Sequence, residues 1–526
     1  MEEATNVAPE AIDDVDPGYK WRVLASVVVG LFMVILDSTV VNVALKTIQL
    51  QFNVSTDQAQ WTISLYTLAL GIATPLSGFL GDRFGSKRIY LSGISLFVIG
   101  SVLAGIFSHT DMLLLLIIAR GIQGVGGGVA LPLGTALLFG AFPPNQRGAA
   151  FGVFGIVLVF APAIGPLLGG WLVDHNQLSW IFFLNLPIGI IGLLIGLRFL
   201  RHNPGSKSAR ADVPGILLSA VGFGAILFAA SIAGQQGVGW SSPRVLISLA
   251  VGAVALVVFT LVELRTAQPL LDLRLYTIPS FAIANVASAV GTIALFGAEF
   301  LLPLYLQILR GESAFQTGLI LLPLAIASAF TGVIAGRISD WIGPRVPLVV
   351  GFLLITYNTF QLAQITLDTS IPFLMFLLAI RGIAVGLIIQ NSQLAALMDV
   401  PLAKLNRGTP LVQATRQTMQ SIGVAVLATI LSSAVTVAIP SAVADGGTPN
   451  LAALPPALRA TVEQSFHLFQ NQYITGFEHA YFATCMVAIL TLVISLFLPG
   501  WPGKYTPKGR QSEAEATPPS ATVEIS

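Results

Sequence analysis

The chain has 526 residues, of which 55% are hydrophobic and only 10% are charged, and its formal net charge is +1. Soluble domains carry about 25% charged residues, so this composition excludes a soluble protein and predicts an all-α integral membrane protein that binds no nucleic acid. The single Cys485 excludes an internal disulfide, and the five histidines show no metal-ligand spacing. We therefore expect no metal and no cofactor.

The predicted membrane spans begin directly after a short polar tail. Residues 1–19 are acidic and lack the features of a cleaved signal peptide, so the first span should be retained. Fourteen stretches are long enough for the roughly 20 apolar residues that cross a bilayer. They lie at about 21–45, 58–80, 88–107, 112–133, 149–172, 179–199, 213–233, 244–262, 281–304, 317–338, 346–365, 371–394, 410–437 and 479–499.

The distribution of basic residues orients these spans. Of the 26 Lys and Arg, 19 fall in the termini or in loops on the terminal side. Only Lys46, Arg244, Arg310 and Arg459 fall on the other side. Because basic loops stay in the cytoplasm, we expect both termini to be cytoplasmic.

An internal repeat organises the chain. Residues 78–88 and 336–345 both read Gly, three residues, Asp, two residues, Gly, one residue, then Lys or Arg. Arg120-Gly121 and Arg381-Gly382 recur at nearly the same offset. Spans one to six thus match spans nine to fourteen, and this predicts two six-helix pseudo-repeats plus two extra central helices. Such duplicated membrane proteins are typically secondary transporters.

The domain boundaries follow from this repeat. We expect a cytoplasmic tail at 1–19, an N-terminal bundle at 20–200, a linker with the two inserted helices at 201–265, a C-terminal bundle at 266–500 and a disordered cytoplasmic tail at 501–526. The C-terminal bundle includes the long outside loop 440–478. Its amphipathic pattern after Pro456 predicts either a helix on the outer surface or an extension of the last span.

The two repeated loops carry a candidate conformational latch. Asp82 can cap or pair with neighbouring helix ends, and Gly85 permits a left-handed backbone. Such contacts can form in one conformation and break in another; the alternative is a charge cluster that only sets the orientation. The latch candidates are Gly78, Asp82, Arg83, Gly85, Lys87, Arg88, Asp340, Gly343 and Arg345.

Two acids and an arginine lie within the predicted spans. Asp37 sits in the first span, Glu299 is its counterpart in the ninth, and Arg120 lies in the fourth. Charged groups inside a membrane are usually functional, and burial disfavours the charged carboxylate, so these residues are candidates for proton coupling, with Arg120 paired to Asp37. The alternatives are a structural Asp37, an interfacial Glu299 and an Arg120 that only joins helices.

Several motifs resemble a known family. The segment 78–88 closely resembles the cytoplasmic loop signature of the major facilitator superfamily, and Gly155–Gly170 resembles its antiporter signature. The segments 36–45 and 180–189 resemble signatures of the fourteen-helix drug:proton antiporters, although Lys46 stands where proline is usual. The resemblance implies a latch at 78–88, proton handling by Arg120, and an exporter's fifth span with Gly155, Gly165, Pro166, Gly169 and Gly170. Tight helix packing is the simpler explanation of those small residues.

Polar residues in the spans form a pool of candidates for a substrate cavity. Gln413, Arg416, Gln417 and Gln420 fall on one face of the thirteenth span, and such a stripe is unsuited to lipid. The whole pool is Tyr66, Gln123, Asn285, Tyr305, Gln390, Asn391, Gln413, Arg416, Gln417 and Gln420.

Together these features predict a proton-coupled antiporter that exports lipophilic or cationic small molecules by alternating access. We expect it to act as a monomer in a bacterial plasma membrane, with a proton and a small lipophilic molecule as its ligands. The same scaffold could instead export an endogenous metabolite, lipid or siderophore. A membrane-embedded enzyme or a channel is disfavoured because the spans carry no catalytic cluster, P-loop or selectivity loop motif.

Overall fold

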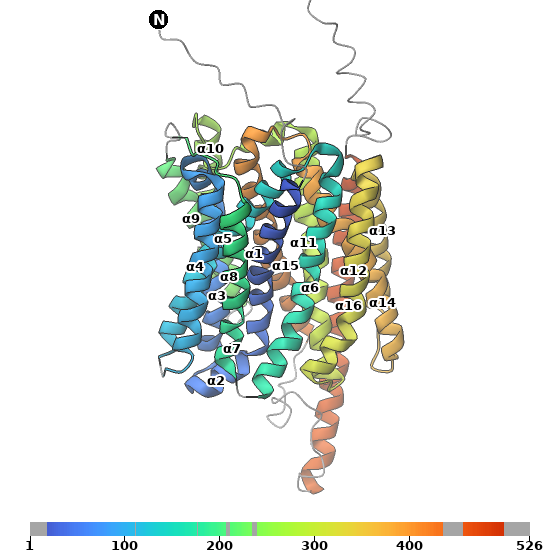
Figure 1. Ribbon diagram of the computed structural model, residues 1–526. Helices are drawn as coiled ribbons and strands as arrows, with labels where there is room; N and C mark the ends of the chain where they lie inside the picture. Colours follow the sequence, from blue (N-terminus) through green and yellow to red (C-terminus); the bar gives the residue numbers. More distant parts are fainter. Residues whose placement is uncertain are drawn as a thin grey trace, which may run out of the picture.

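The computed structural model describes residues 18–110, 112–175, 177–206, 211–233, 239–434 and 456–498. The two predicted tails, apart from residues 18 and 19, and residues 440–455 of the predicted outside loop lie outside this part of the chain. Every regular element in the described part is helical, and the long helices run side by side in one bundle (Figure 1).

The elements follow the predicted repeat. The first half contains α1 (Tyr19–Val43), α2 (Leu45–Phe52), α3 (Thr56–Phe84), α4 (Ser86–Phe107), α5 (Leu113–Ala141), α6 (Arg147–Asp174), α7 (Leu178–Phe183) and α8 (Asn185–Phe199). The inserted pair is α9 (Val213–Ala233) and α10 (Pro243–Arg265). The second half contains α11 (Pro279–Leu304), α12 (Ala314–Ile342), α13 (Arg345–Leu362), α14 (Ile371–Leu397), α15 (Leu405–Ala434) and α16 (Pro456–Leu496). The short turns are η2 (Pro144–Gln146), η3 (Leu273–Thr277), the π-turn η4 (Tyr305–Leu309) and η5 (Leu402–Lys404).

Thirteen helices in the described part are long and apolar enough to cross a membrane. The one predicted span missing from this set is the thirteenth, α15, whose 30 residues extend about 45 Å at 1.5 Å per residue. Its polar stripe from Gln413 to Gln420 lowers its hydropathy, but α15 packs against α3, α5, α9, α11 and α16 within the bundle. The protein is therefore a multi-pass integral membrane protein.

Equivalent helices make equivalent contacts in the two halves. In the first half α3 and α4 pack on α5, and α6 and α8 pack on α1; in the second, α12 and α13 pack on α14, and α15 and α16 pack on α11. The repeat also extends to the helix starts. Ser55 and Gln58 form a capping box at the start of α3, and Ser313 and Gln316 form the same box at the start of α12. These contacts confirm the predicted architecture of two pseudo-repeats.

The inserted pair lies outside the two repeats. Helix α9 packs on α3 of the first half and on α15 of the second, and α10 packs mainly on α9. Both helices lie at one edge of the bundle in Figure 1. The pair therefore contacts both halves at one side of their junction.

Three elements differ in detail from the predicted spans. The sixth span is divided at Leu184 into α7 and α8, and α2 follows α1 almost without a break. The last span is continuous with the amphipathic segment before it, because α16 has 41 residues and extends about 60 Å. The second alternative for this segment, an extension of the last span, is therefore correct.

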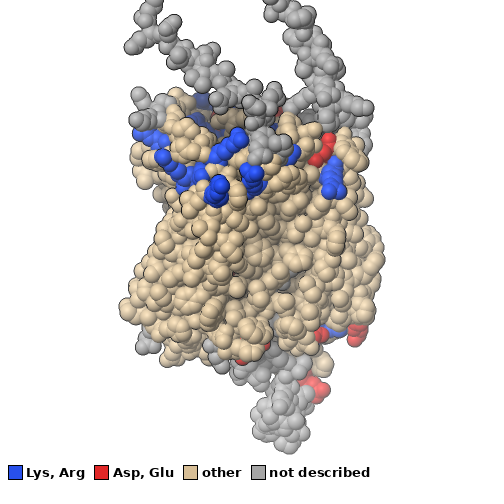
Figure 2. Space-filling view, in the orientation of Figure 1, with Lys and Arg blue, Asp and Glu red and all other residues tan. Residues whose placement is uncertain are grey.

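Basic residues mark one end of the bundle. This end, where α1 begins and α8 ends, is called the basic face below; on the side shown in Figure 2, Lys and Arg gather there and are sparse elsewhere. Its residues include Arg83, Lys87, Arg198, Arg201, Arg345 and Arg407.

Candidate functional site

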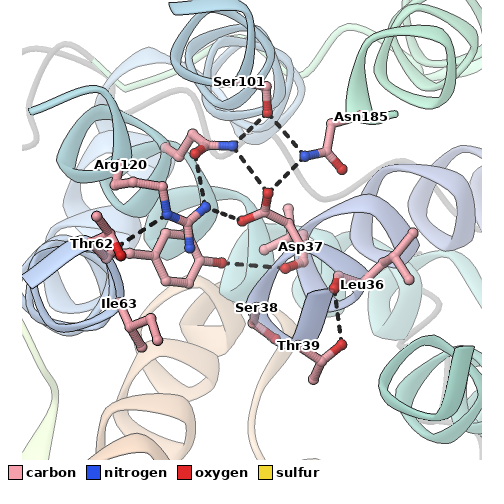
Figure 3. Close-up of polar contacts among 12 residues, drawn as sticks. Leu36, Asp37, Ser38, Thr39, Thr62, Ile63, Ser101, Arg120 and Asn185 are labelled. Atoms are coloured by element: carbon pink, nitrogen blue, oxygen red, sulfur yellow. Dashed lines mark hydrogen bonds and ion pairs between the residues drawn. The ribbon is translucent and has the colours of Figure 1, made fainter. Parts of the chain in front are cut away.

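Asp37 lies at the centre of a buried polar cluster between α1, α5 and α8 (Figure 3). Its side chain is fully buried and forms an ion pair with Arg120 Nη1 of α5. Asp37 Oδ1 accepts hydrogen bonds from Asn185 Nδ2 of α8 at 2.7 Å and from Gln123 Nε2 at 3.2 Å. At 1.5 Å per residue, Asp37 lies about 27 Å from the start of α1, deep within the bundle.

Arg120 is held from several sides. Its Nε donates to the carbonyl of Thr62 on α3 at 3.2 Å, and its Nη1 donates to Gln123 Oε1 at 2.8 Å. The guanidinium carbon lies 4.2 Å from the ring centre of Tyr66, a cation–π contact. The Tyr66 hydroxyl in turn donates to the carbonyl of Val34 on α1 at 3.3 Å. Tyr66 and Gln123 thus belong to the Asp37 cluster.

The charges within this cluster balance. A charged group inside a membrane needs a partner, and removing one member of a buried ion pair leaves the other uncompensated, at a cost of about 3–5 kcal/mol. Asp37 and Arg120 therefore compensate each other's charge inside the bundle.

Asp82 connects the two halves at the basic face. It lies at the end of α3, and its Oδ2 pairs with Arg407 Nε at 3.0 Å while its Oδ1 accepts from Asn406 Nδ2 at 2.9 Å. Both partners lie in the first turn of α15. The contact is close, since a methyl group on Gly78 would lie 2.3 Å from the carbonyl oxygen of Asn406.

Asp340 makes the symmetric contact from the second half. It lies at the end of α12, and its two carboxylate oxygens accept from the backbone N–H of Gly148 at 2.7 Å and of Ala149 at 2.9 Å. These amides belong to the first turn of α6, where free N–H groups and the helix dipole favour a negative charge. Gly336 lies directly against Gly148, since a methyl group on it would be 2.1 Å from the Gly148 carbonyl oxygen.

The other residues of the two loops act within their own halves. Gly85 and Gly343 end α3 and α12 with φ of 93° and 84°, values that favour glycine. Lys87 Nζ donates to the carbonyls of Leu197 and Leu200 at the end of α8, and Arg345 Nη2 donates to that of Leu496 at the end of α16. Arg88 is exposed, and Arg83 lies partly buried beside Asp82 in sequence.

The small residues of α6 allow close contacts with both halves. A methyl group on Gly165 would lie 2.1 Å from Thr39 Oγ1 of α1, and one on Gly169 would lie 2.9 Å from the Val40 carbonyl oxygen. A methyl group on Gly155 would lie 2.6 Å from Gln390 Cγ of α14. Gly170 has open space around it, and the side chain of Pro166 lies outside the described residues.

Five predicted cavity residues form hydrogen bonds within the protein. Besides Tyr66 and Gln123, Asn285 Nδ2 donates to the Tyr276 hydroxyl at 2.5 Å, and Asn391 Oδ1 accepts from Ser339 Oγ at 2.5 Å. The Tyr305 hydroxyl donates to the Thr366 carbonyl at 2.7 Å, near the end of the bundle opposite the basic face. Gln390 lies against the backbone of α6 at Gly155.

The stripe on α15 has no such partners. Gln413, Arg416, Gln417 and Gln420 are all partly buried, and within the described part of the chain none of their side chains has a hydrogen bond or an ion pair. Arg416 lies about 16 Å along α15 from its start. Charged residues at this depth face the bundle interior or a water-filled cavity, so this stripe is the best candidate for a wall that faces a polar space.

Glu299 cannot be compared with Asp37, because its side chain lies outside the described residues. Arg381 of α14 is fully buried, and its Nη2 donates to the carbonyls of Leu295 at 2.7 Å and Ala294 at 3.2 Å, both on α11. Arg381 thus reaches α11 as Arg120 reaches α1. The resemblance between the halves extends into the membrane at these two arginines.

Several residues of these sites were not predicted from the sequence. Asn185 is visible in the sequence as an isolated amide in an apolar span, and the structure shows that it binds Asp37. Ser101 accepts a hydrogen bond from Asn185 Nδ2 at 3.1 Å, and no feature of the sequence distinguishes it from other serines in the spans. Asn406, Arg407 and the amides of Gly148 and Ala149 could not be assigned as latch partners, because no local pattern shows which helix ends meet across two halves.

Comparisons with known proteins agree on the fold and the family. A profile described as Major Facilitator Superfamily matches residues 27–428. The chain is 30% identical over 476 residues to lincomycin resistance protein LmrB of Listeria innocua, covering 90% of this chain and 96% of that protein. It is 32% identical over 505 residues to a multidrug resistance protein B homolog of Mycobacterium tuberculosis, covering 94% and 90%. A structure of the human organic anion transporter MFSD10 superposes with a TM-score of 0.59 at 13% identity, covering 91% of this chain and all of that one.

Proposed function

Because this chain belongs to the major facilitator superfamily and is a transporter rather than an enzyme, we propose that it is a proton-coupled antiporter that exports lipophilic or cationic small molecules. The names of its relatives support efflux of drugs. The bacterial relatives and the basic face support a place in the plasma membrane with both termini in the cytoplasm. A single copy of the fold contains both halves of the site, so the protein acts as a monomer.

The observation that carries the proton coupling is the buried pair of Asp37 and Arg120. A proton from the outside neutralises Asp37, Arg120 keeps its bonds to Gln123 and the Thr62 carbonyl but loses its anionic partner, and the site changes its packing at the junction of α1, α3 and α5. When the site faces the cytoplasm, Asp37 loses the proton and the pair forms again. One proton thus moves inward for each conformational cycle.

The latch sets which side is closed. Asp82 and Asp340 join the halves at the basic face in this conformation. Both contacts must break before the halves can separate at that face, and two separate acids make the closure symmetric. This geometry supports alternating access by rocking of one half against the other.

Efflux from proteoliposomes tests the proposal. The readout is movement of a lipophilic dye under an imposed pH gradient, for the wild type, Asp37→Asn and the matched control Asp57→Asn, which changes an exposed acid at the start of α3. We expect gradient-driven movement that Asp37→Asn loses and Asp57→Asn keeps. Equal transport by Asp37→Asn would contradict a role of Asp37 in coupling.

A second candidate function is export of an endogenous metabolite, lipid or siderophore, and one observation favours it. Arg416 has no acidic partner in the described part of the chain, so a substrate with a carboxylate or phosphate would complete its environment. Competition of acidic amphiphiles against the dye distinguishes the two functions. Inhibition by an acid but not by its neutral ester would favour this second candidate.

A further inference from the structure

The inserted helix pair contains two buried carboxyl groups that the proposed transport cycle does not use. Asp212 directly precedes α9, and Glu263 lies in the last turn of α10; the two residues are 7% and 1% exposed. Both lie at the end of the bundle that forms the basic face. A methyl group built on Gly215 would lie 2.5 Å from Asp212 Oδ2 and 2.6 Å from Glu263 Oε1. The two carboxyl groups therefore face each other over this glycine.

Three of the four carboxyl oxygens have no hydrogen bond within the described part of the chain. Asp212 Oδ1 accepts from the Gly215 N–H at 2.9 Å, but Asp212 Oδ2 and both oxygens of Glu263 have no hydrogen-bond partner within the described part of the chain. The backbone N–H groups of Leu270 and Leu271 lie close to Glu263 and favour its charged form, but burial and the neighbouring Asp212 oppose that form. Two buried carboxylates in this arrangement repel each other strongly. A single proton between them replaces the repulsion with a short O–H···O bond.

The charged groups around the pair are engaged elsewhere. Arg274 Nη2 donates to the carbonyls of Leu264 and Thr266 at the end of α10, at 3.2 and 3.0 Å. Asp272 pairs with Lys404 of η5 at 2.8 Å. Among the described residues, Asp212 is the charged group that acts on Glu263, and Arg265 is exposed.

We propose that Asp212 and Glu263 bind one proton between them and form a second proton site, separate from Asp37, at the basic-face end of the inserted pair. The shared proton holds the start of α9 to the end of α10. It also relieves the repulsion beside the buried residues Leu270 and Leu271, whose backbone lies close to Glu263. This site goes beyond the proposed transport function and does not depend on it.

The proton site is linked to the latch through a short series of contacts. Directly after Leu271, Asp272 binds Lys404, and Lys404 precedes the first turn of α15. That turn carries Asn406 and Arg407, which hold Asp82. Loss of the proton places two negative charges together beneath residues 270–272 and displaces this segment. The latch then weakens as the pH at the basic face rises.

The sign of the pH dependence follows from the same geometry. The folded protein binds the shared proton more tightly than the unfolded chain, where the two acids are apart. The stability that the pair contributes is therefore complete at low pH and is lost as the pH rises through the titration of the pair.

Thermal unfolding of the purified full-length protein across the neutral to alkaline range tests the proposal. The wild type should lose stability as the pH rises. Glu263→Gln and Asp212→Asn should remove this loss, because an amide N–H donates to the remaining carboxylate at every pH. The control Asp57→Asn should keep the wild-type slope, and slopes that are identical in all four proteins would refute the shared proton.

Two further substitutions and a metal titration test what neutralises the two carboxyl groups. Gly215→Ala places a methyl group between the carboxyl groups and should also reduce the pH dependence, whereas Gly140→Ala, which has open space around it, should not. Arg210→Gln should leave the titration unchanged, and a titration that disappears in this variant would assign the neutralising charge to Arg210. Stabilisation of the wild type but not of Glu263→Gln by Mg²⁺ or Ca²⁺ would make the pair a cation site and overturn the proposal.

Hydrogen exchange tests the link to the latch. Amides in residues 402–410 should exchange faster in the wild type as the pH is raised, after correction for the intrinsic pH dependence of exchange. Glu263→Gln should suppress this increase. An increase of equal size in both proteins would show that the start of α15 does not respond to the pair.

Discussion

Asp82 and Asp340 occupy equivalent positions in the two halves, and each binds the first turn of a helix in the opposite half. Asp82 pairs with the side chain of Arg407 at 3.0 Å, whereas Asp340 accepts the backbone amides of Gly148 and Ala149. The two acids thus close the same face by different chemistry. The Asp82 contact depends on the side chain of Arg407, whereas the Asp340 contact depends only on backbone N–H groups at the start of α6.

This difference predicts unequal effects of substitution. Asp82→Asn removes the ion pair with Arg407, and hydrogen bonds to charged groups contribute about 1.5–3 kcal/mol, so the population open at the basic face should rise roughly tenfold or more. Distances between spin labels on opposite halves measure this population. Arg407→Gln should have a similar effect, and an unchanged distance distribution in both variants would contradict a latch.

Asp340→Asn should weaken the closure less than Asp340→Ala. The amide keeps one oxygen that can accept from Gly148 or Ala149, while alanine leaves both N–H groups without an acceptor, at about 0.5–2 kcal/mol for the loss of a helix cap. The same spin-label distances provide the measurement. Equal effects of the two substitutions would show that the charge of Asp340, rather than its capping bonds, maintains the contact.

The Asp37–Arg120 pair predicts a non-additive loss of stability. Arg120→Gln leaves a buried carboxylate without its cation and should destabilise the protein by about 3–5 kcal/mol. Adding Asp37→Asn should recover most of this loss but should not restore proton-driven transport. Thermal stability and efflux of the single and double variants form a double-mutant cycle, and additive effects would contradict a direct interaction.

Gly165→Ala and Gly170→Ala should differ although they lie in the same helix. The methyl group at position 165 would lie 2.1 Å from Thr39 Oγ1, so α1 and α6 must separate at a cost of about 1–3 kcal/mol. Position 170 has open space, and alanine there should be neutral or slightly stabilising. Unfolding temperatures of the two variants test this contrast, and equal values would show that α6 does not need its close approach to α1.

Arg416→Gln should change the choice of substrate more than the fold. Since Arg416 has no protein partner in the described part of the chain, its removal should leave stability nearly unchanged. Transport of acidic amphiphiles should fall at least tenfold relative to that of neutral or cationic dyes, because a charge-assisted contact is lost. Gln417→Ala is a matched control on the same face, and a uniform decrease for all substrates would assign Arg416 a structural role.

The two repeated loops could be identified from the sequence, whereas the residues that they contact could not. The spacing of Gly78, Asp82 and Gly85 and its repetition at 336–345 predicted two equivalent turns, because a positive φ after a helix favours glycine at that position. The identity of Arg407 and Gly148 as partners depends on how two bundles meet. No periodicity within either segment contains that information.

The predicted cavity residues also show what the sequence alone does not determine. Helical spacing placed Gln413, Arg416, Gln417 and Gln420 on one face, and the structure leaves them without partners. Tyr305, Asn285 and Asn391 had the same polar character in sequence but bind neighbouring helices or loops. Whether a polar side chain in a span pairs or faces a cavity depends on which helix lies beside it.

The membrane class, the positions of the spans, the twofold repeat and the presence of charges inside the bilayer all follow from the order of amino acids. These properties depend on local hydropathy and spacing, because a bilayer requires apolar helices of fixed length wherever they pack. The folded chain was needed to show that Asn185 binds Asp37, that Asp340 caps α6, and that Asp212 faces Glu263. Each of these contacts joins residues far apart in the chain or on different helices, and close packing of those helices brings them within hydrogen-bond distance.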